Sequence, residues 1–171
     1  MSLREDLFRR ADGSEDTFAV VTRDDSVVVV CADGPRLLMT EQYRYAARRW
    51  SLELPQGGVG PGESTADAAL RELREETGWE ADTPRVVAGP LHEAADWATQ
   101  AFHVVSVRPL RLDAPQREPG EEGMRVRWVS REELPALVAG GHIVDAATLA
   151  ALLVVDLLPP SAARVAANQY T

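Results

Sequence analysis

Short apolar runs alternate with polar turn residues in the first third of the chain. Three runs are rich in β-branched and aromatic residues: "TFAVVTR" (17–23), "SVVVVCA" (26–32) and "RLLMTEQYRY" (36–45). Asp24-Asp25 separates the first two, and Asp33-Gly34-Pro35 separates the last two. Runs of this composition, bounded by turn residues, are typical of β-strands. We therefore predict an antiparallel β-meander over about residues 17–45.

A glycine-rich segment and an amphipathic helix follow. The stretch "SLELPQGGVGPGES" (51–64) holds four glycines and two prolines, so it predicts a strand that soon enters a long loop. Ser64, with Asp67 three residues later, forms a capping pattern, and Gly78 is suited to end a helix. Between them one helical face carries the less polar side chains Ala66, Ala69, Leu70, Leu73 and Thr77. The pattern predicts a helix over 65–77.

The second half of the chain continues to mix the two periodicities. It contains three further candidate strands and two candidate helices, at 85–91, 101–110, 124–130, 131–141 and 145–158. This order indicates an α/β fold, more strictly α+β, in which a mixed sheet is covered by helices. The length of 171 residues fits one domain spanning residues 1–171.

Composition and charge narrow the function classes. The chain has 27 acidic and 18 basic residues, and every basic residue is arginine. No broad positive field is available for a nucleic acid backbone, whereas a small anionic ligand bridged by divalent cations is compatible with this charge. Cys31 ends an apolar run and is expected in the core. The N-terminus lacks the apolar stretch of a signal peptide or membrane span, so we expect a cytoplasmic protein with no membrane partner.

The segment "RELREETG" (71–78) concentrates three acids, Glu72, Glu75 and Glu76, on one side of the predicted helix. Like charges at these spacings repel one another. Arg71 and Arg74 could balance them on a solvated helix face, or the acids could hold a metal. The helix alone does not decide between these interpretations, but the preceding loop does.

From Gly57 the chain reads Gly, five residues, Glu63, seven residues, Arg71-Glu72-Leu73, one residue, Glu75-Glu76, one residue, Gly78 and the apolar Trp79. This spacing resembles the signature of the Nudix hydrolases, with the Nudix box at residues 57–79. The resemblance implies the Nudix fold and hydrolysis of nucleoside diphosphates linked to another group. It also implies divalent cations, Mg²⁺ with Mn²⁺ as a substitute, which neutralise the pyrophosphate and activate water.

The resemblance carries roles over to the matching positions. Glu72 and Glu76 are expected to ligate the metal directly, Glu75 to ligate a further ion or share its shell, and the carbonyl of Gln56 to add a ligand. Gly57 and Gly58 would let the backbone pass close to ions and phosphates.

Two further box residues have supporting roles. Arg71 is expected to orient Glu75, and Glu63 to support the loop or the outer metal shell. A plain surface salt bridge for Arg71 and an exposed turn position for Glu63 are the alternatives.

The flanks resemble the ADP-ribose and nucleoside diphosphate sugar pyrophosphatases. "EQYRYAARRWSLELPQGG" (41–58) carries Gln-Tyr-Arg, Trp and Leu-Glu-Leu-Pro elements of that subgroup. Arg44 is a candidate phosphate ligand, and Tyr43 or Tyr45 a candidate stacking residue, although strand alternation places Arg44 on the face opposite the tyrosines. Trp97, in "HEAADWATQ" (92–100), is either a stacking surface for substrate or a packed loop residue, and this segment departs from the usual ADP-ribose pyrophosphatase pattern.

The general base in this subgroup is often a glutamate on a loop before the final strand. "REPGEEGM" (117–124) offers Glu118, Glu121 and Glu122, and alignment back from the following strand favours Glu122 or Glu121. If these are merely surface acids, Glu75 or Glu72 would have to accept the proton of the attacking water.

We therefore expect Mg²⁺-dependent hydrolysis of ADP-ribose or a related nucleotide sugar to a nucleoside monophosphate and a sugar phosphate. A Nudix hydrolase of nucleoside triphosphates or dinucleoside polyphosphates, and a non-catalytic nucleotide-sugar-binding module, are the alternatives. The subgroup is typically a homodimer that packs or exchanges its N-terminal strands, and residues 1–30 are long enough for this.

Overall fold

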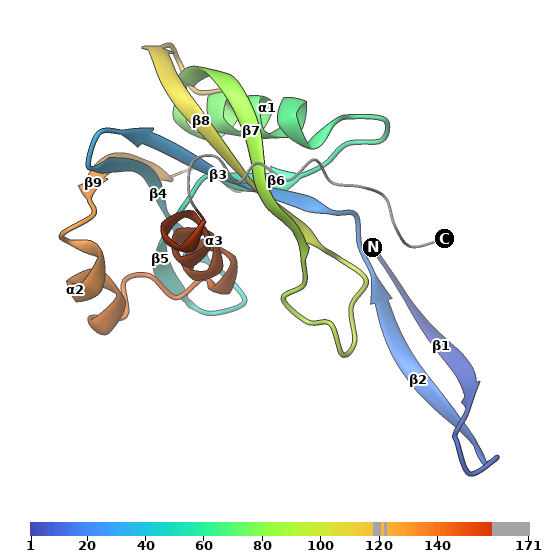
Figure 1. Cartoon of the computed structure of the whole chain (residues 1–171). Coiled ribbons are helices and arrows are strands. Elements are labelled where there is room, and N and C mark those ends of the chain that lie inside the picture. The colour runs from blue at the N-terminus through green and yellow to red at the C-terminus, as the bar shows by residue number, and fades with distance from the viewer. Residues whose placement is uncertain (118–120, 122, 159–171) are drawn as a thin grey trace.

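A computed structural model describes residues 1–117, 121 and 123–158. A seven-stranded mixed sheet forms its centre, with the strand order β5-β4-β3-β8-β7, β6 paired to β3 and β9 paired to β4 (Figure 1). The strands of this sheet are β3 (Ser26–Asp33), β4 (Arg36–Arg44), β5 (Arg49–Glu53), β6 (Gln56–Gly58), β7 (Trp79–Leu91), β8 (Phe102–Leu112) and β9 (Arg125–Ser130). The predicted mixed sheet with helices is confirmed.

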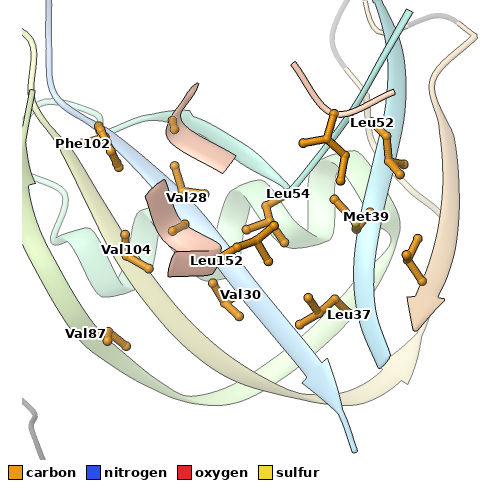
Figure 2. Packing of buried hydrophobic residues seen from close by; sticks show 14 residues of the cluster. Val28, Val30, Leu37, Met39, Leu52, Leu54, Val87, Phe102, Val104 and Leu152 are labelled. Carbon is orange, nitrogen blue, oxygen red and sulfur yellow. The ribbon is translucent and has the colours of Figure 1, made fainter. Parts of the chain in front are cut away.

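Strand β3 is buried on both faces and divides the core in two. Val28 and Val30 belong to the apolar cluster shown in Figure 2, whereas Val27, Val29 and Cys31 belong to a second cluster on the other face. This follows from the alternation of side chains along a strand. A run of five apolar residues therefore serves two cores. Cys31 is fully buried, as predicted, and burial raises the pKa of its thiol to about 12.

Helix α1 (Thr65–Thr77) covers the second cluster and begins and ends at the predicted residues. The Ser64 side chain accepts a hydrogen bond from the backbone N–H of Asp67, and Gly78 ends the helix with a left-handed φ of 77°. Only glycine adopts such a φ at little cost, which is why the helix stops there. Ala69 and Leu73 of this helix are fully buried against the sheet.

Helices α2 (Leu134–Ala139) and α3 (Ala146–Leu157) form the C-terminal part of the described chain, within the region predicted to be helical. The Asp145 side chain caps α3 by accepting the N–H of Thr148 at 2.7 Å. Ala147, Ala151 and Leu152 of α3 pack on the cluster of Figure 2. The sheet thus lies between α1 and α3. No helix among the described residues is long and apolar enough to span a membrane.

The predicted meander is wrong at its first step. Strand β2 (Glu15–Thr22) pairs along its length with β1 (Ser2–Arg9) in a separate two-stranded sheet, instead of with β3. The hairpin projects away from the main body (Figure 1). Seven of the eight residues of β1 and four of the eight residues of β2 are exposed. The composition of residues 17–23 predicted a strand but carried no information about which neighbour would supply its hydrogen bonds.

Candidate active site

The site is built around the short strand β6, in a segment for which the sequence predicted no regular structure. Gln56 pairs with Val28, and Gly57 with Val27, of the buried strand β3. This pairing brings the start of the Nudix-like segment beside α1. A segment rich in glycine and proline can therefore be held rigidly, because the neighbouring strand supplies its hydrogen bonds.

Gly57 lies directly against Glu72. A Cβ atom at Gly57 would stand 2.0 Å from the carboxyl carbon of Glu72, whereas a Cβ at Gly58 would have no atom within 4 Å. The glycine at position 57 therefore allows a close approach between the β6 backbone and a carboxylate of α1. At position 58 a side chain would point into open space.

Arg71 connects the loop to α1. Its Nη1 donates to Glu72 at 2.8 Å and to Glu75 at 3.0 Å. Its Nη2 donates to the carbonyl of Gly58 at 2.8 Å, and Nε donates to Glu63 at 2.8 Å. These bonds raise the pKa of Arg71, with Glu63 as the largest cause. The guanidinium thus contacts Glu75, Glu72 and Glu63 together, and its role in orienting Glu75 stays a prediction.

Glu63 supports the loop that precedes the helix. Its carboxylate accepts hydrogen bonds from Arg71 and from the backbone N–H of Gly60, the latter at 2.8 Å. The hydrogen bonds from Arg71 and then from Gly60 hold the pKa of Glu63 at about 2. Of the two predicted roles, loop support is the one that the contacts agree with.

Glu76 departs from the predicted stripe of acids. Only 2% of the residue is exposed, and it shares the buried side of α1 with Leu73 and Thr77. The reason is helical geometry, since Glu76 follows Ala69 by seven residues and so lies only about 20° around the helix from it. Burial, then the charges of Glu121 and Glu72, raise the pKa of Glu76 well above its ordinary value.

The three glutamates of α1 therefore do not form a solvated face. The side chains of Glu72 and Glu75 are 12% and 25% exposed. Burial is the largest cause of the raised pKa of Glu72, and hydrogen bonds from Arg71 oppose it. Three acids thus lie close together, and Arg71 bonds to only two of them, Glu72 and Glu75, so a further cation would lower the free-energy cost of the cluster.

A cleft of about 350 Å³ opens beside these groups. We call it the carboxylate cleft, and its lining residues are Asp24, Gln56, Gly57, Gly58, Val59, Gly60, Pro61, Arg71, Glu72, Glu75 and Glu121. Of the two acids favoured as general base, Glu121 lies in this cleft, whereas Glu122 and the further candidate Glu118 lie outside the described residues. Glu121 is close enough to contribute to the raised pKa values of Glu72 and Glu76.

A second cleft of about 510 Å³ lies across β6. We call it the arginine cleft, and its lining residues are Met1, Arg23, Asp24, Ser26, Arg44, Gln56, Gly57, Gly58, Glu93, Gln100 and Asp145. Asp24 and the three residues of β6 line both clefts. The two clefts therefore share one wall and adjoin each other.

Arg44 reaches the arginine cleft as part of a hydrogen-bonded chain. Its Nε lies 3.0 Å from both carboxylate oxygens of Glu53, and Nη2 also contacts Glu53. The Gln56 side chain donates to Glu53 at 2.9 Å. Burial opposes the charge of Arg44, but Glu53 and then Asp145 and Glu76 outweigh it and raise the pKa of Arg44. The 1% exposed Glu53 thus fixes Arg44 and Gln56 together.

Sequence reasoning missed Arg23, Glu93 and Asp145, which line the arginine cleft, and also Glu53, which is buried behind Arg44. Asp145 was visible only as the start of a predicted helix, and Glu93 only as part of an atypical loop. Burial and the charge of Asp145 raise the pKa of Glu93, which places the two acids near each other. They come from segments more than 50 residues apart, so no local signal could have joined them.

Tyr43 and Trp97 line neither cleft. Tyr43 packs edge to face on Trp50, with ring centroids 6.0 Å apart, on the strand face opposite Arg44. Trp97 is 51% exposed, and its carbonyl accepts the N–H of Val21 at 2.8 Å. A role for either ring in stacking on substrate stays a prediction.

The donor set fits a divalent cation bound through oxygen. Oε2 of Glu76 is buried and has no hydrogen-bond partner within the described part of the chain. An orphaned carboxylate oxygen beside Glu72 and the Gln56 backbone is what a hard cation such as Mg²⁺ would satisfy. Among the described residues no group of three or more His, Cys, Asp and Glu side chains has the arrangement of a metal site. Arg71 meanwhile holds Glu72 and Glu75.

This fold and this carboxylate cleft define a class of protein. Residues 22–152 match the NUDIX domain family, and the chain belongs to that family. It is an enzyme, a pyrophosphohydrolase of the Nudix type.

Individual relatives agree with this assignment. The chain is 32% identical over 157 residues to an ADP-ribose pyrophosphatase of Mycobacterium tuberculosis (strain ATCC 25618 / H37Rv), covering 90% of this chain and 75% of the relative. It is 30% identical over 131 residues to an ADP-ribose pyrophosphatase of Bacillus subtilis (strain 168), covering 76% and 70%. A crystal structure of an ADP compounds hydrolase superposes with a TM-score of 0.72 at 19% identity, covering 91% of each chain, and shows the same fold.

Proposed function

We propose that this enzyme hydrolyses the pyrophosphate linkage of ADP-ribose or a related nucleoside diphosphate sugar. Water attacks one phosphorus atom, and the bond from that phosphorus to the bridging oxygen breaks. The products are a nucleoside monophosphate and a sugar phosphate. The reaction class also agrees with the relatives named ADP-ribose pyrophosphatase.

The observation that carries this proposal is the shared wall between the two clefts. Gln56, Gly57 and Gly58 line both the carboxylate cleft and the arginine cleft. A substrate with two ends joined by a pyrophosphate can cross this wall and place its phosphates beside the α1 acids. One end then lies beside Arg44, Glu93 and Asp145, whose guanidinium and carboxylates suit phosphate oxygens and sugar hydroxyls respectively.

Glu72, Glu76 and the Gln56 carbonyl would hold Mg²⁺, or Mn²⁺ in its place, with Glu75 nearby. When bound, the cation would neutralise the pyrophosphate and lower the pKa of a coordinated water. The chain prepares for this in two ways. Arg71 orients Glu72 and Glu75 by hydrogen bonds. Burial shields the Glu76 carboxylate from bulk water, which would compete with it for the cation.

Glu121 is the proposed general base. It accepts a proton from the attacking water as the new phosphorus–oxygen bond forms. Glu72 and Glu75 line the same cleft, where their carboxylates accept hydrogen bonds from Arg71. Glu121 lines the same cleft from a different segment and so can face the water from the opposite side.

We also propose that two chains form a homodimer through the N-terminal hairpin. Leu3 and Leu7 are 75% and 67% exposed, and Phe8 and Phe18 pack edge to face while remaining 41% and 45% exposed. Apolar side chains on a projecting hairpin are stabilised when a second copy covers them. Light scattering of the purified protein should give about twice the mass of one chain, and a monomer would contradict this proposal.

A substrate panel tests the proposed activity. ADP-ribose, other nucleoside diphosphate sugars, nucleoside triphosphates and diadenosine polyphosphates are incubated with Mg²⁺, with Mn²⁺ and with a chelator. Chromatography then measures monophosphate release. We expect release from diphosphate sugars that stops with the chelator, and Glu76→Gln protein serves as the control for contaminating hydrolases. Cleavage of triphosphates alone would contradict the proposal.

A further inference from the structure

The segment after β8 returns to the C-terminal end of α1. The backbone N–H of Asp113 donates to the carbonyl of Gly78 at 2.7 Å, and that of Gln116 donates to the carbonyl of Glu75 at 2.9 Å. The packing is tight, since a Cβ at Gly78 would stand 2.2 Å from the carbonyl oxygen of Asp113. The last carbonyls of a helix have no partner within the helix. Here residues 113–116 supply donors for them.

Arg117 adds a side-chain donor to the same helix end. Its Nε donates to the carbonyl of Glu76 at 3.0 Å. Residues 111–116 are all exposed, and Arg117 is the first residue of this segment to be partly covered. A cation at the C-terminal end of a helix also interacts favourably with the helix dipole. The two backbone donors do not depend on the side chains of Asp113 and Gln116 as long as neither is replaced by proline, whereas the contact from Arg117 depends on its side chain.

A second attachment of this segment lies three residues after Glu121, at the buried Met124. Its carbonyl accepts the N–H of Met124 at 2.9 Å, and Met124 is 4% exposed. The chain is therefore attached to α1 through Arg117, four residues before Glu121, and to the core through Met124, three residues after it. Between these attachments Glu121 lines the carboxylate cleft with Glu72 and Glu75.

We propose that Arg117 is a positioning residue for the reaction, acting through Glu121. By holding the backbone carbonyl of Glu76, Arg117 fixes the chain four residues before Glu121 relative to the helix that carries the proposed metal-binding acids. A general base must lie within hydrogen-bonding reach of the water it deprotonates, so a small displacement of this segment reduces turnover. The inference rests on the proposed role of Glu121 as base.

The first measurement compares steady-state kinetics of Arg117→Ala, Arg117→Lys and Arg111→Ala. We expect Arg117→Ala to lower kcat by about tenfold with little change in KM, because misplacement of a catalytic group affects the chemical step. Arg117→Lys keeps a donor and should recover part of the loss. Arg111→Ala is the matched control. It removes an exposed arginine that pairs only with Glu80 in the described contacts, and it should retain wild-type kcat.

The second measurement is a double-mutant cycle with Glu121→Gln, run on whichever panel substrate the wild-type enzyme hydrolyses. If Arg117 acts through Glu121, Arg117→Ala will lower kcat little further once Glu121→Gln has removed the base. Additive losses, an unchanged kcat in Arg117→Ala, or an unchanged kcat in Glu121→Gln would each overturn the inference. Failure of the proposed sugar specificity would appear separately in the substrate panel. Thermal melting identifies any variant that fails to fold, and Arg117→Lys then carries the test.

Discussion

The two adjoining clefts are constructed differently. The carboxylate cleft draws eight of its eleven lining residues from positions 57–75, and Arg71 satisfies Glu63, Glu72, Glu75 and the Gly58 carbonyl within that stretch. The arginine cleft collects Arg23, Arg44, Glu93 and Asp145 from distant segments. One cleft is encoded locally, and the other exists only because strands bring remote positions together.

The arginines of the two clefts, Arg71 and Arg44, differ in the same way. Arg71 bonds to acids of its own loop and helix, which agrees with a structural and orienting role toward the acids proposed to be catalytic. Arg44 bonds to one buried acid, Glu53, and 41% of its side chain remains exposed, so it can also meet a ligand. Changes in the carboxylate cleft should therefore alter kcat, and changes in the arginine cleft should alter KM.

The largest effect is expected from Glu76→Gln. This variant preserves the shape of the side chain but removes a charge from the proposed cation site, and metal stabilisation of the transition state is worth several kcal/mol. We expect kcat to fall by about a thousandfold. Isothermal titration with Mg²⁺ should show weaker binding, and circular dichroism should show an unchanged fold. Near-wild-type turnover would remove Glu76 from the site.

Gly57→Ala should have the next largest effect. The new Cβ would meet the Glu72 carboxyl group at 2.0 Å, and that flexible side chain would move instead of the backbone. We expect kcat to fall by about a hundredfold with little loss of thermal stability. Gly58→Ala is the matched control, since its Cβ meets nothing within 4 Å. Equal effects of the two variants would show that Gly57 is not needed for a close approach to Glu72.

A smaller effect, now on binding, is expected in the arginine cleft. Arg44→Ala alone would leave the buried Glu53 uncompensated, so it is combined with Glu53→Gln. Loss of one charge-assisted hydrogen bond to substrate should raise KM by about tenfold and leave kcat nearly unchanged. Glu53→Gln alone separates the effect of the acid. A fall in kcat without a change in KM would move Arg44 from substrate binding to catalysis.

The smallest effect concerns stability and pH. The pKa of Glu63 in the folded protein is about 2, below its ordinary value of 4.5. Its ionised form therefore stabilises the fold fully above about pH 4.5, and this contribution is lost as the pH falls through about 2. Glu63→Gln should cost about 1 kcal/mol of unfolding free energy at neutral pH. Urea unfolding with chelator present should show this difference shrinking toward pH 2, and a pH-independent difference would contradict it.

Sequence patterns correctly predicted the helix over 65–77 and the buried strand at 26–32. Each of these depends on residues only a few positions apart. They assigned Glu76 to an acidic face, although it follows the buried Ala69 by two helical turns. They also joined residues 17–23 to the central sheet. The first error could have been avoided from the helical repeat itself, because a spacing of seven residues returns to nearly the same side of a helix. The second concerns a partner that lies outside the local pattern, the strand β1 that completes the hairpin.

The sequence by itself determined the chemistry of the carboxylate cleft, because Gly57, Glu63, Arg71, Glu72 and Glu75 act on one another across a single loop and helix. Only the tertiary structure decided which residues from distant segments line the two clefts beside these groups. Glu121 is brought to the cleft by a segment that binds the end of α1, and Glu93 and Asp145 are brought to Arg44 by the pairing of β7 and β8 and by the cap of α3. Contacts of this kind are made by backbone hydrogen bonds and packing between distant segments, and these leave no periodic mark in the sequence.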